Sequence, residues 1–277
     1  MAGLFPPVDP EAGRGRPRRR LVPFTALTPN LVTLLGLCAG LTAIRMAIEG
    51  RFDIAVAAIL FAVILDGIDG RLARYFRATS TFGAQLDSLA DFVNFGVAPA
   101  LFLYAWRLDT LSSFGWICAL VLAICTGLRL ARFNAALVVE EPRPDWHRDY
   151  FVGVPAPAGA WIVFLPFFLE RIGGGEIRVA ALVVALYSVV VALLMVSRIP
   201  TLSGKRIGQR IPREMVLPVL VVGVLVVALL ASYPFSSLAI GALGYLAHIP
   251  FAWRARNRAE ARSRAATSGG LGSRPEE

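Results

Sequence analysis

The sequence is poor in the residue types that build disulfides, thiolate or imidazole metal sites and lysine-rich surfaces. Its 277 residues include three cysteines, two histidines and a single lysine, Lys205. The cysteines (Cys38, Cys118 and Cys125) are odd in number, lie inside apolar stretches and lack the spacing of a metal site. A disulfide scaffold is therefore excluded, and the cysteines are interpreted as small reduced core residues.

Charge is also scarce. Charged residues make up 17% of the chain and hydrophobic residues 56%, with a mean hydropathy of +0.64. That hydropathy is too high for a water-soluble domain. The net charge of +9 does not indicate nucleic-acid binding, because the basic residues are scattered between long apolar runs. The sequence predicts an integral membrane protein.

A helix needs about 20 mainly apolar residues to cross a bilayer. Eight segments reach or approach this length, so the predicted fold is an all-α polytopic membrane helix bundle. These segments are 29–48, 53–76, 86–106, 112–134, 156–172, 178–197, 214–232 and 236–253. Eight crossings leave both termini on one side, and 23 of the 28 basic residues then fall on that side. The positive-inside rule makes that side the cytoplasm.

Four aspartates lie where a membrane helix should carry no charge. The second apolar segment ends on Asp66 and Asp69, and the third begins with Asp87 and Asp91. A carboxylate inside a membrane helix costs roughly 2.5–3.5 kcal/mol, and four facing carboxylates repel one another unless a cation lies between them. Their i, i+3 and i, i+4 spacings put each pair on one helical stripe. A short link near 79–81 makes the helices antiparallel neighbours, so both stripes are expected at the same cytoplasmic level.

Carboxylates without accompanying cysteine or histidine favour the hard cations Mg²⁺, Mn²⁺ or Ca²⁺ over zinc. Two such ions would fit four carboxylates in the arrangement that clamps a transferring phosphoryl group. Gly70, Ala73 and Gly83 are small enough to let a bulky group approach the backbone, and Arg74 is suited to pairing with a phosphate. A proton relay or a packing role is the alternative for one isolated aspartate, but not for four on two facing stripes.

These residues resemble the signature of the CDP-alcohol phosphotransferase family. The run from Asp66 to Arg74, then eight residues, Gly83, three residues, Asp87, three residues and Asp91 matches that signature without a gap. The resemblance implies a six-helix catalytic core, a homodimer and chemistry at the cytoplasmic face of the cell membrane.

The resemblance also implies a role for each site residue. Asp66, Asp69 and Asp87 would bind divalent metal together with the CDP pyrophosphate, and Asp91 would touch the metal and act as the base on the acceptor hydroxyl. The implied cofactor is Mg²⁺ or Mn²⁺, as two ions. The residues implied to contact CDP are Asn30, Thr33, Asp66, Gly70, Ala73, Arg74 and Ser80.

Stretches outside the signature are similar to the bacterial and archaeal phosphatidylserine synthases of this family. They are 82–91, 94–99, 127–134, 150–160 and 197–205, joined by the two segments near 214–253. This resemblance implies transfer of the phosphatidyl group from CDP-diacylglycerol to L-serine, with CMP as the second product.

Arg129, Arg132 and Asn134 are the predicted contacts to the acceptor alcohol. Two arginines at i, i+3 near the end of the fourth segment can clamp a carboxylate. They would equally suit the phosphate of glycerol 3-phosphate or of an inositol phosphate, so charge alone leaves the acceptor open.

The predicted organisation has four parts. They are a basic cytoplasmic tail (1–27), the membrane core (28–200), a basic loop with two further transmembrane helices (201–254) and a disordered cytoplasmic tail (255–277). His147 and His248 have no nucleophile or metal partner in the sequence and are interpreted as packing or polar-contact residues.

Two other classes of membrane protein also carry intramembrane acids. An aspartate-rich prenyltransferase would space its acidic motifs differently and would lack the continuation through Gly70, Ala73 and Arg74. An ion transporter would line a route with its acids, whereas these acids are expected at one membrane level.

Overall fold

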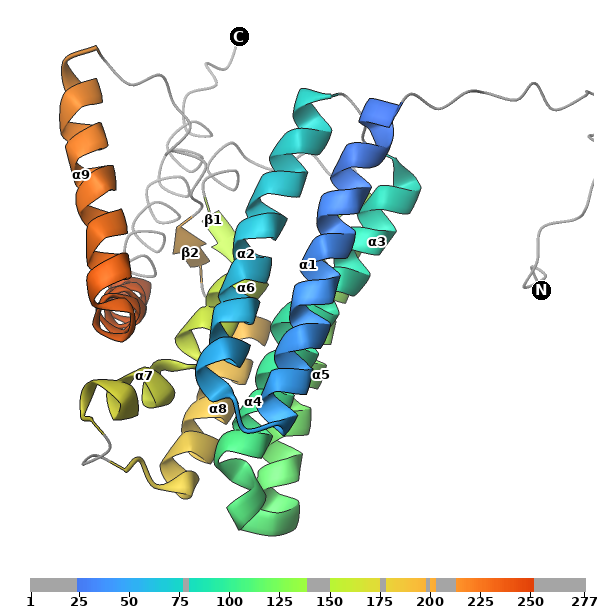
Figure 1. The fold of residues 1–277 in the computed structure, drawn as a ribbon. Helices are drawn as coiled ribbons and strands as arrows, with labels where there is room; N and C mark the ends of the chain where they lie inside the picture. The colour runs from blue at the N-terminus through green and yellow to red at the C-terminus, as the bar shows by residue number, and fades with distance from the viewer. Residues whose placement is uncertain are drawn as a thin grey trace, which may run out of the picture.

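The computed structural model describes residues 24–76, 80–138, 150–174, 178–197, 200–202 and 213–251, which are almost entirely helical (Figure 1). In chain order the elements are α1 (Phe24–Ile48), α2 (Phe52–Tyr75), α3 (Thr81–Phe92), the π-helical turn η1 (Val93–Val97), α4 (Ala98–Trp106), the 3₁₀ turn η2 (Leu108–Leu111), α5 (Ser112–Val138), β1 (Tyr150–Val152), α6 (Ala156–Ile162), α7 (Leu165–Ile172), α8 (Ala181–Val196), β2 (Pro200–Leu202), α9 (Arg213–Ser232) and a last helix over 234–251. The predicted all-α fold is confirmed, with one short antiparallel ribbon of β1 and β2 added to it.

Long apolar helices dominate the described part of the chain. Four stretches there are long and apolar enough to cross a bilayer: Thr28–Ile48, Thr81–Trp106, Leu108–Ala136 and Glu214–Ser232. Seven of the eight segments expected from the sequence coincide with helical stretches. The chain is a multi-pass membrane protein, and the count of eight crossings stays a prediction. The expected tails lie outside the described residues up to residue 23 and from residue 255 onward.

The fifth expected segment, 156–172, is wrong as a single helix. The structure divides it into α6 and α7 with a turn at Val163 and Phe164. Pro166 explains the break, because it has no backbone N–H and its ring would clash with the carbonyl of Ile162 four residues earlier. The hydroxyl of Tyr187 on α8 donates to that carbonyl at 2.7 Å. A side chain from another helix thus satisfies a backbone group that proline leaves unpaired.

A wide turn separates α3 from α4 within one long helical stretch. In this turn, η1, the N–H of Ala98 donates to the carbonyl of Val93, five residues back. Pro99 follows at once and cannot bond to the carbonyl of Phe95, so the wider turn gives its ring room. The turn also places Asn94 against Gly36 and Gly40 of α1, where a Cβ on Gly40 would overlap the Asn94 amide.

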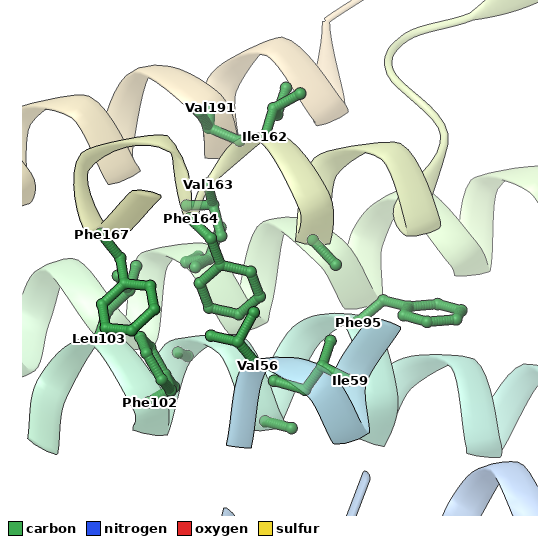
Figure 2. Close-up of a cluster of buried hydrophobic side chains, with 14 of the residues drawn as sticks. Val56, Ile59, Phe95, Phe102, Leu103, Ile162, Val163, Phe164, Phe167 and Val191 are labelled. Carbon is green, nitrogen blue, oxygen red and sulfur yellow. The ribbon is translucent and has the colours of Figure 1, made fainter. Parts of the chain in front are cut away.

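Part of the hydrophobic core lies where α2, α4, α6, α7 and α8 meet (Figure 2), and α1, α5 and the last helix add further buried residues to it. Phe102 of α4 is fully buried, and its ring packs edge-on against Phe164 and Phe167 with centroids 4.9 and 5.2 Å away. Phe164 extends toward Val56 of α2, and Ile162 lies beside Val191 of α8 (Figure 2). The segment broken by Pro166 therefore serves as the centre of the core.

Ion pairs hold the end of the bundle at which α2 begins. Arg107 at the end of α4 donates to both carboxylate oxygens of Glu170, at 2.5 and 2.6 Å, and Arg171 pairs with Asp53 at 2.8 Å. Asp53 precedes Asp66 by 13 residues of the same helix, which is about 20 Å. The aspartates at the two ends of α2 therefore have different partners, and Asp66 and Asp69 lie at the opposite end from these ion pairs.

Candidate active site

The end of α2 and the first half of α3 bring the signature aspartates together. One carboxylate oxygen from each of Asp66, Asp69 and Asp87 lies within 4.8 Å of the others. The side chain of Asp91 is in hydrogen-bonding contact with that of Asp66. All four expected metal ligands are thus neighbours, as the two-stripe interpretation predicts, with Asp91 on the side of Asp66.

The start of α3 is defined by Ser80. Its backbone is extended, and its hydroxyl oxygen accepts the N–H of Gly83 at 3.0 Å, which is an N-cap interaction. Because the cap determines where the helix begins, it also determines that Asp87 lies two turns further on. Ser80 therefore contributes to the position of an acidic residue whatever else it binds.

Thr33 of α1 is buried and lies against Asp69. Its hydroxyl is 2.8 Å from Oδ2 of Asp69 and 3.1 Å from the carbonyl oxygen of Pro29. Donation to the carboxylate orients Asp69 from a neighbouring helix, as partners outside the ligand set of metal sites do. The sequence had suggested only a CDP contact for Thr33.

A cavity of about 190 Å³ opens between α1, α2 and α3 beside the carboxylates. Five of the seven residues expected to contact CDP line it, together with two of the aspartates and three residues of α1 and α3. The lining residues are Pro29, Asn30, Thr33, Asp69, Gly70, Ala73, Ser80, Gly83, Ala84 and Asp87. Small side chains therefore make room directly beside the acidic cluster.

Arg74, one of the two expected CDP contacts that do not line the cavity, is exposed one turn beyond it. Its Nε donates to the carbonyl oxygen of Gly70 at 3.0 Å. This hydrogen bond holds the guanidinium near the cavity, although Arg74 does not line it. Asp66 likewise does not line the cavity and instead faces Asp91.

The three expected acceptor contacts on α5 occupy different surroundings. Arg132 donates to the carbonyl oxygens of Val196 and Ser197, at 2.8 and 3.2 Å, at the end of α8. Asn134 donates to the hydroxyl of Ser88 on α3 at 2.9 Å. Both side chains therefore tie α5 to neighbouring helices.

Arg129 differs from its neighbour one turn away. It interacts electrostatically with Asp91 and Asp66 and with Tyr245 of the last helix. Its Nε is buried and has no hydrogen-bond partner among the described residues. Of the two arginines, Arg129 is thus the one placed beside the acidic cluster.

Sequence reasoning missed Tyr245 and interpreted His248 as a packing or polar-contact residue. Both lie in the helix over 234–251, and Trp161 of α6 packs against Gly241 of the same helix. The available signal was a tyrosine and a histidine three residues apart in an otherwise apolar segment. That signal was weak, because only the folded chain shows which helix faces the pair.

The carboxylate oxygens of the cluster are suited to binding a hard divalent cation. Carboxylate oxygens bind Mg²⁺ at about 2.0–2.1 Å and Ca²⁺ at about 2.3–2.6 Å, and three such oxygens within 4.8 Å can converge on one ion after small rotations. The adjoining cavity and a nearby carboxyl group, that of Asp91, are the further parts that a metal-assisted phosphoryl transfer needs.

Comparison with known proteins gives two matches to family models. One described as CDP-alcohol phosphatidyltransferase matches residues 26–194. A second, described as CDP-alcohol phosphatidyltransferase 2, matches residues 214–250. Together they cover the helices that hold the acidic cluster and the last two helices.

Several curated proteins are similar to most of the chain. It is 40% identical over 237 residues to the CDP-diacylglycerol–serine O-phosphatidyltransferase of Mycobacterium leprae, across 86% of this chain and 78% of that protein. Identity to the protein of the same name from Mycobacterium tuberculosis is 38% over 242 residues, across 87% and 83%. The Bacillus subtilis protein of that name is 39% identical over 140 residues, across 50% of this chain and 75% of its own length.

Proposed function

Because the chain belongs to the CDP-alcohol phosphatidyltransferase family, we propose that it transfers the phosphatidyl group of CDP-diacylglycerol to L-serine, forming phosphatidylserine and CMP. The observation that carries the choice of serine is the similarity, across 86% of the chain, to a protein named for that acceptor. The acidic cluster and the small-residue cavity beside it support the transfer chemistry independently of that name.

Asp66, Asp69 and Asp87 are the residues that would hold divalent metal, Mg²⁺ or Mn²⁺, with room for two ions when Asp91 also takes part. Bound metal would neutralise the pyrophosphate and stabilise the CMP that leaves. The described residues fit this use, because their ligand atoms are all carboxylate oxygens and lie within 4.8 Å of one another.

The cavity between α1, α2 and α3 is the proposed place of the CDP group. Gly70, Ala73 and Gly83 leave the backbone accessible there, while Asn30 and Ser80 offer polar atoms. Arg74, just outside the cavity, would pair with a phosphate oxygen. Positioning the pyrophosphate against the acidic cluster is the main contribution that these residues can make to the rate.

Asp91 is the proposed general base. The oxygen of the acceptor hydroxyl attacks the phosphorus that carries the diacylglycerol, the bond from that phosphorus to the CMP oxygen breaks, and Asp91 takes the hydroxyl proton. An alcohol at neutral pH is a weak nucleophile, so a base in contact with it is needed. Asp91 is suited because it is in hydrogen-bonding contact with Asp66 and interacts electrostatically with Arg129.

The proposal includes the setting of the enzyme. The distribution of basic residues supports an inner-membrane protein whose termini and active site face the cytoplasm. Donor lipid would then enter sideways from the cytoplasmic leaflet and serine from the cytosol. We further propose that the enzyme is a homodimer. Its chain is divided into a tail (1–27), a core (28–200), a basic loop with two further helices (201–254) and a second tail (255–277).

The test of this function is CMP release by the purified protein with CDP-diacylglycerol, Mg²⁺ or Mn²⁺ and one acceptor at a time. We expect release with L-serine that disappears when the divalent metal is chelated. Release only with glycerol 3-phosphate or an inositol phosphate would retain the family chemistry and contradict serine as the acceptor. No release with any alcohol would contradict the catalytic assignment itself.

Gly83→Val is expected to raise the KM for CDP-diacylglycerol about tenfold or more. A Cβ at this position would lie 2.9 Å from Oδ1 of Asn30 and 3.1 Å from Oγ of Ser80, so a branched side chain fills the cavity and displaces polar atoms. Gly223→Val is the matched control, because Gly223 lies on α9, does not line the cavity, and a Cβ on it meets no atom within 4 Å. Equal KM values for the two variants would contradict the placement of CDP in this cavity.

A further inference from the structure

The last helix carries a polar stripe inside an apolar sequence. Gly241, Tyr245 and His248 are spaced i, i+4 and i+7 and therefore share one face of the helix over 234–251. This helix lies outside the family model that matches 26–194 and inside the one that matches 214–250.

The helix over 234–251 packs on the bundle, whereas α9 before it does not. Ala239, Ala242 and Ile249 are buried, while every residue of α9 from 214 onward is exposed. One close approach and one electrostatic interaction indicate what the stripe faces. Gly241 meets the ring of Trp161 on α6, where a Cβ would lie 2.6 Å from Cζ2, and Tyr245 interacts electrostatically with Arg129 on α5.

Each of these three helices carries a buried polar atom. Nε of Arg129, Nε1 of Trp161 and Nε2 of His248 are all buried, and none has a hydrogen-bond partner among the described residues. Buried polar groups almost always have a partner, so three such atoms on adjoining helices indicate a polar region. Arg129 joins this region to Asp91, with which it interacts electrostatically.

We propose that the last helix forms one wall of the acceptor chamber, with Tyr245 and His248 as residues that determine which acceptor binds. The proposal rests on the function proposed above, because it places the acceptor next to Asp91. The ligand class that fits is a small hydroxy compound bearing a negative group and a hydrogen-bonding group, such as the carboxylate and ammonium of an amino acid.

The charges of the residues around the proposed chamber indicate which group of the acceptor each of them binds. Arg129 pairs with the carboxylate of the acceptor, because it is the cation placed beside the acidic cluster. The hydroxyl of Tyr245 and the ring nitrogen of His248 hydrogen-bond to the polar groups of the same molecule. Its own hydroxyl is then left facing Asp91, which takes the proton. Arg132 instead holds the end of α8 through its two carbonyl contacts.

The first test is the steady-state kinetics of Tyr245→Phe in the purified full chain with CDP-diacylglycerol. We expect the KM for L-serine to rise about tenfold, the effect of one lost hydrogen bond to a charged partner. The kcat and the KM for CDP-diacylglycerol should stay within about twofold, since this substitution leaves the shape of the side chain intact. A purely structural role for Tyr245 would instead change all three constants together.

Tyr233→Phe is the matched control, because Tyr233 precedes the same helix and is exposed. It should leave the KM for serine unchanged. An unchanged KM in Tyr245→Phe would overturn the role of this residue.

His248→Leu and His248→Asn provide a second test. The leucine variant should raise the KM for serine, and the asparagine variant, which keeps a polar group, should restore part of the affinity. Equal KM values for leucine, asparagine and wild type would overturn the chamber.

The outcomes for the wild type separate this inference from the function on which it rests. If wild-type protein releases CMP only with glycerol 3-phosphate, the serine assignment fails and the same variants are assayed with that acceptor. A raised KM for it in Tyr245→Phe would support the chamber with a different ligand. An unchanged KM would overturn the chamber as well.

Discussion

Asp91→Asn is expected to lower kcat for CMP release by about 10²–10⁴-fold, the range of a general base that is lost. Asparagine has nearly the same shape but cannot take the proton of the acceptor hydroxyl. The KM for CDP-diacylglycerol should change far less, because Asp91 does not line the cavity proposed for CDP. The measurement is initial-rate CMP release at saturating serine and donor.

The control for this variant is Asp109→Asn. Asp109 is an exposed aspartate of η2, just beyond the helical stretch that carries Asp91, and its substitution should leave kcat unchanged. Both proteins should elute from a sizing column like the wild type, which separates lost chemistry from lost folding. A near-normal kcat for Asp91→Asn would remove the base assignment.

Asp69→Asn is expected to weaken binding of divalent metal at least tenfold and to abolish CMP release at the metal concentration that saturates the wild type. Loss of an outer partner of a metal ligand typically costs 10–100-fold in affinity, and removal of a charged ligand should cost no less. The measurement is Mn²⁺ binding by electron paramagnetic resonance, with CMP release titrated against the metal. Activity should return in part at higher metal concentrations.

Asp53→Asn is the matched control for Asp69→Asn. Asp53 belongs to the same helix, about 24 Å from Asp69 along its axis, and pairs with Arg171. Its substitution should leave the affinity for Mn²⁺ unaltered. Unchanged metal affinity in Asp69→Asn would contradict the assignment of the acidic cluster as the metal site.

The fold was predictable to the extent that it follows from hydropathy and helical periodicity. Both signals are local, and seven of the eight segments that they predicted coincide with helical stretches of the structure. The exception is the segment 156–172, where the hydropathy of the segment and its proline favour different structures. Its hydropathy favours one continuous helix, but Pro166 breaks it because proline has no N–H and its ring would clash with the carbonyl of Ile162. Tyr187, from α8, satisfies that carbonyl. Nothing within the segment itself predicts that distant partner.

In the candidate site, too, local spacing predicted part of the arrangement and helix packing decided the rest. The spacing of Asp66, Asp69, Asp87 and Asp91 predicted two facing acidic stripes, and the structure places the four side chains together. Spacing did not distinguish Arg129 from Arg132, which are alike in type and lie one turn apart. Packing distinguishes them, since only Arg132 donates to the end of α8.

By itself, the sequence determined the membrane character, the helical class, the acidic stripes and the family resemblance, because each depends on residues close together in the chain. Only the tertiary structure decided that Thr33 orients Asp69, that a small cavity opens beside the carboxylates, and that the last helix brings Tyr245 to Arg129. These interactions join residues 36 to 116 positions apart, and their formation depends on how whole helices pack. Periodicity describes a face of one helix, and packing decides which other helix that face meets.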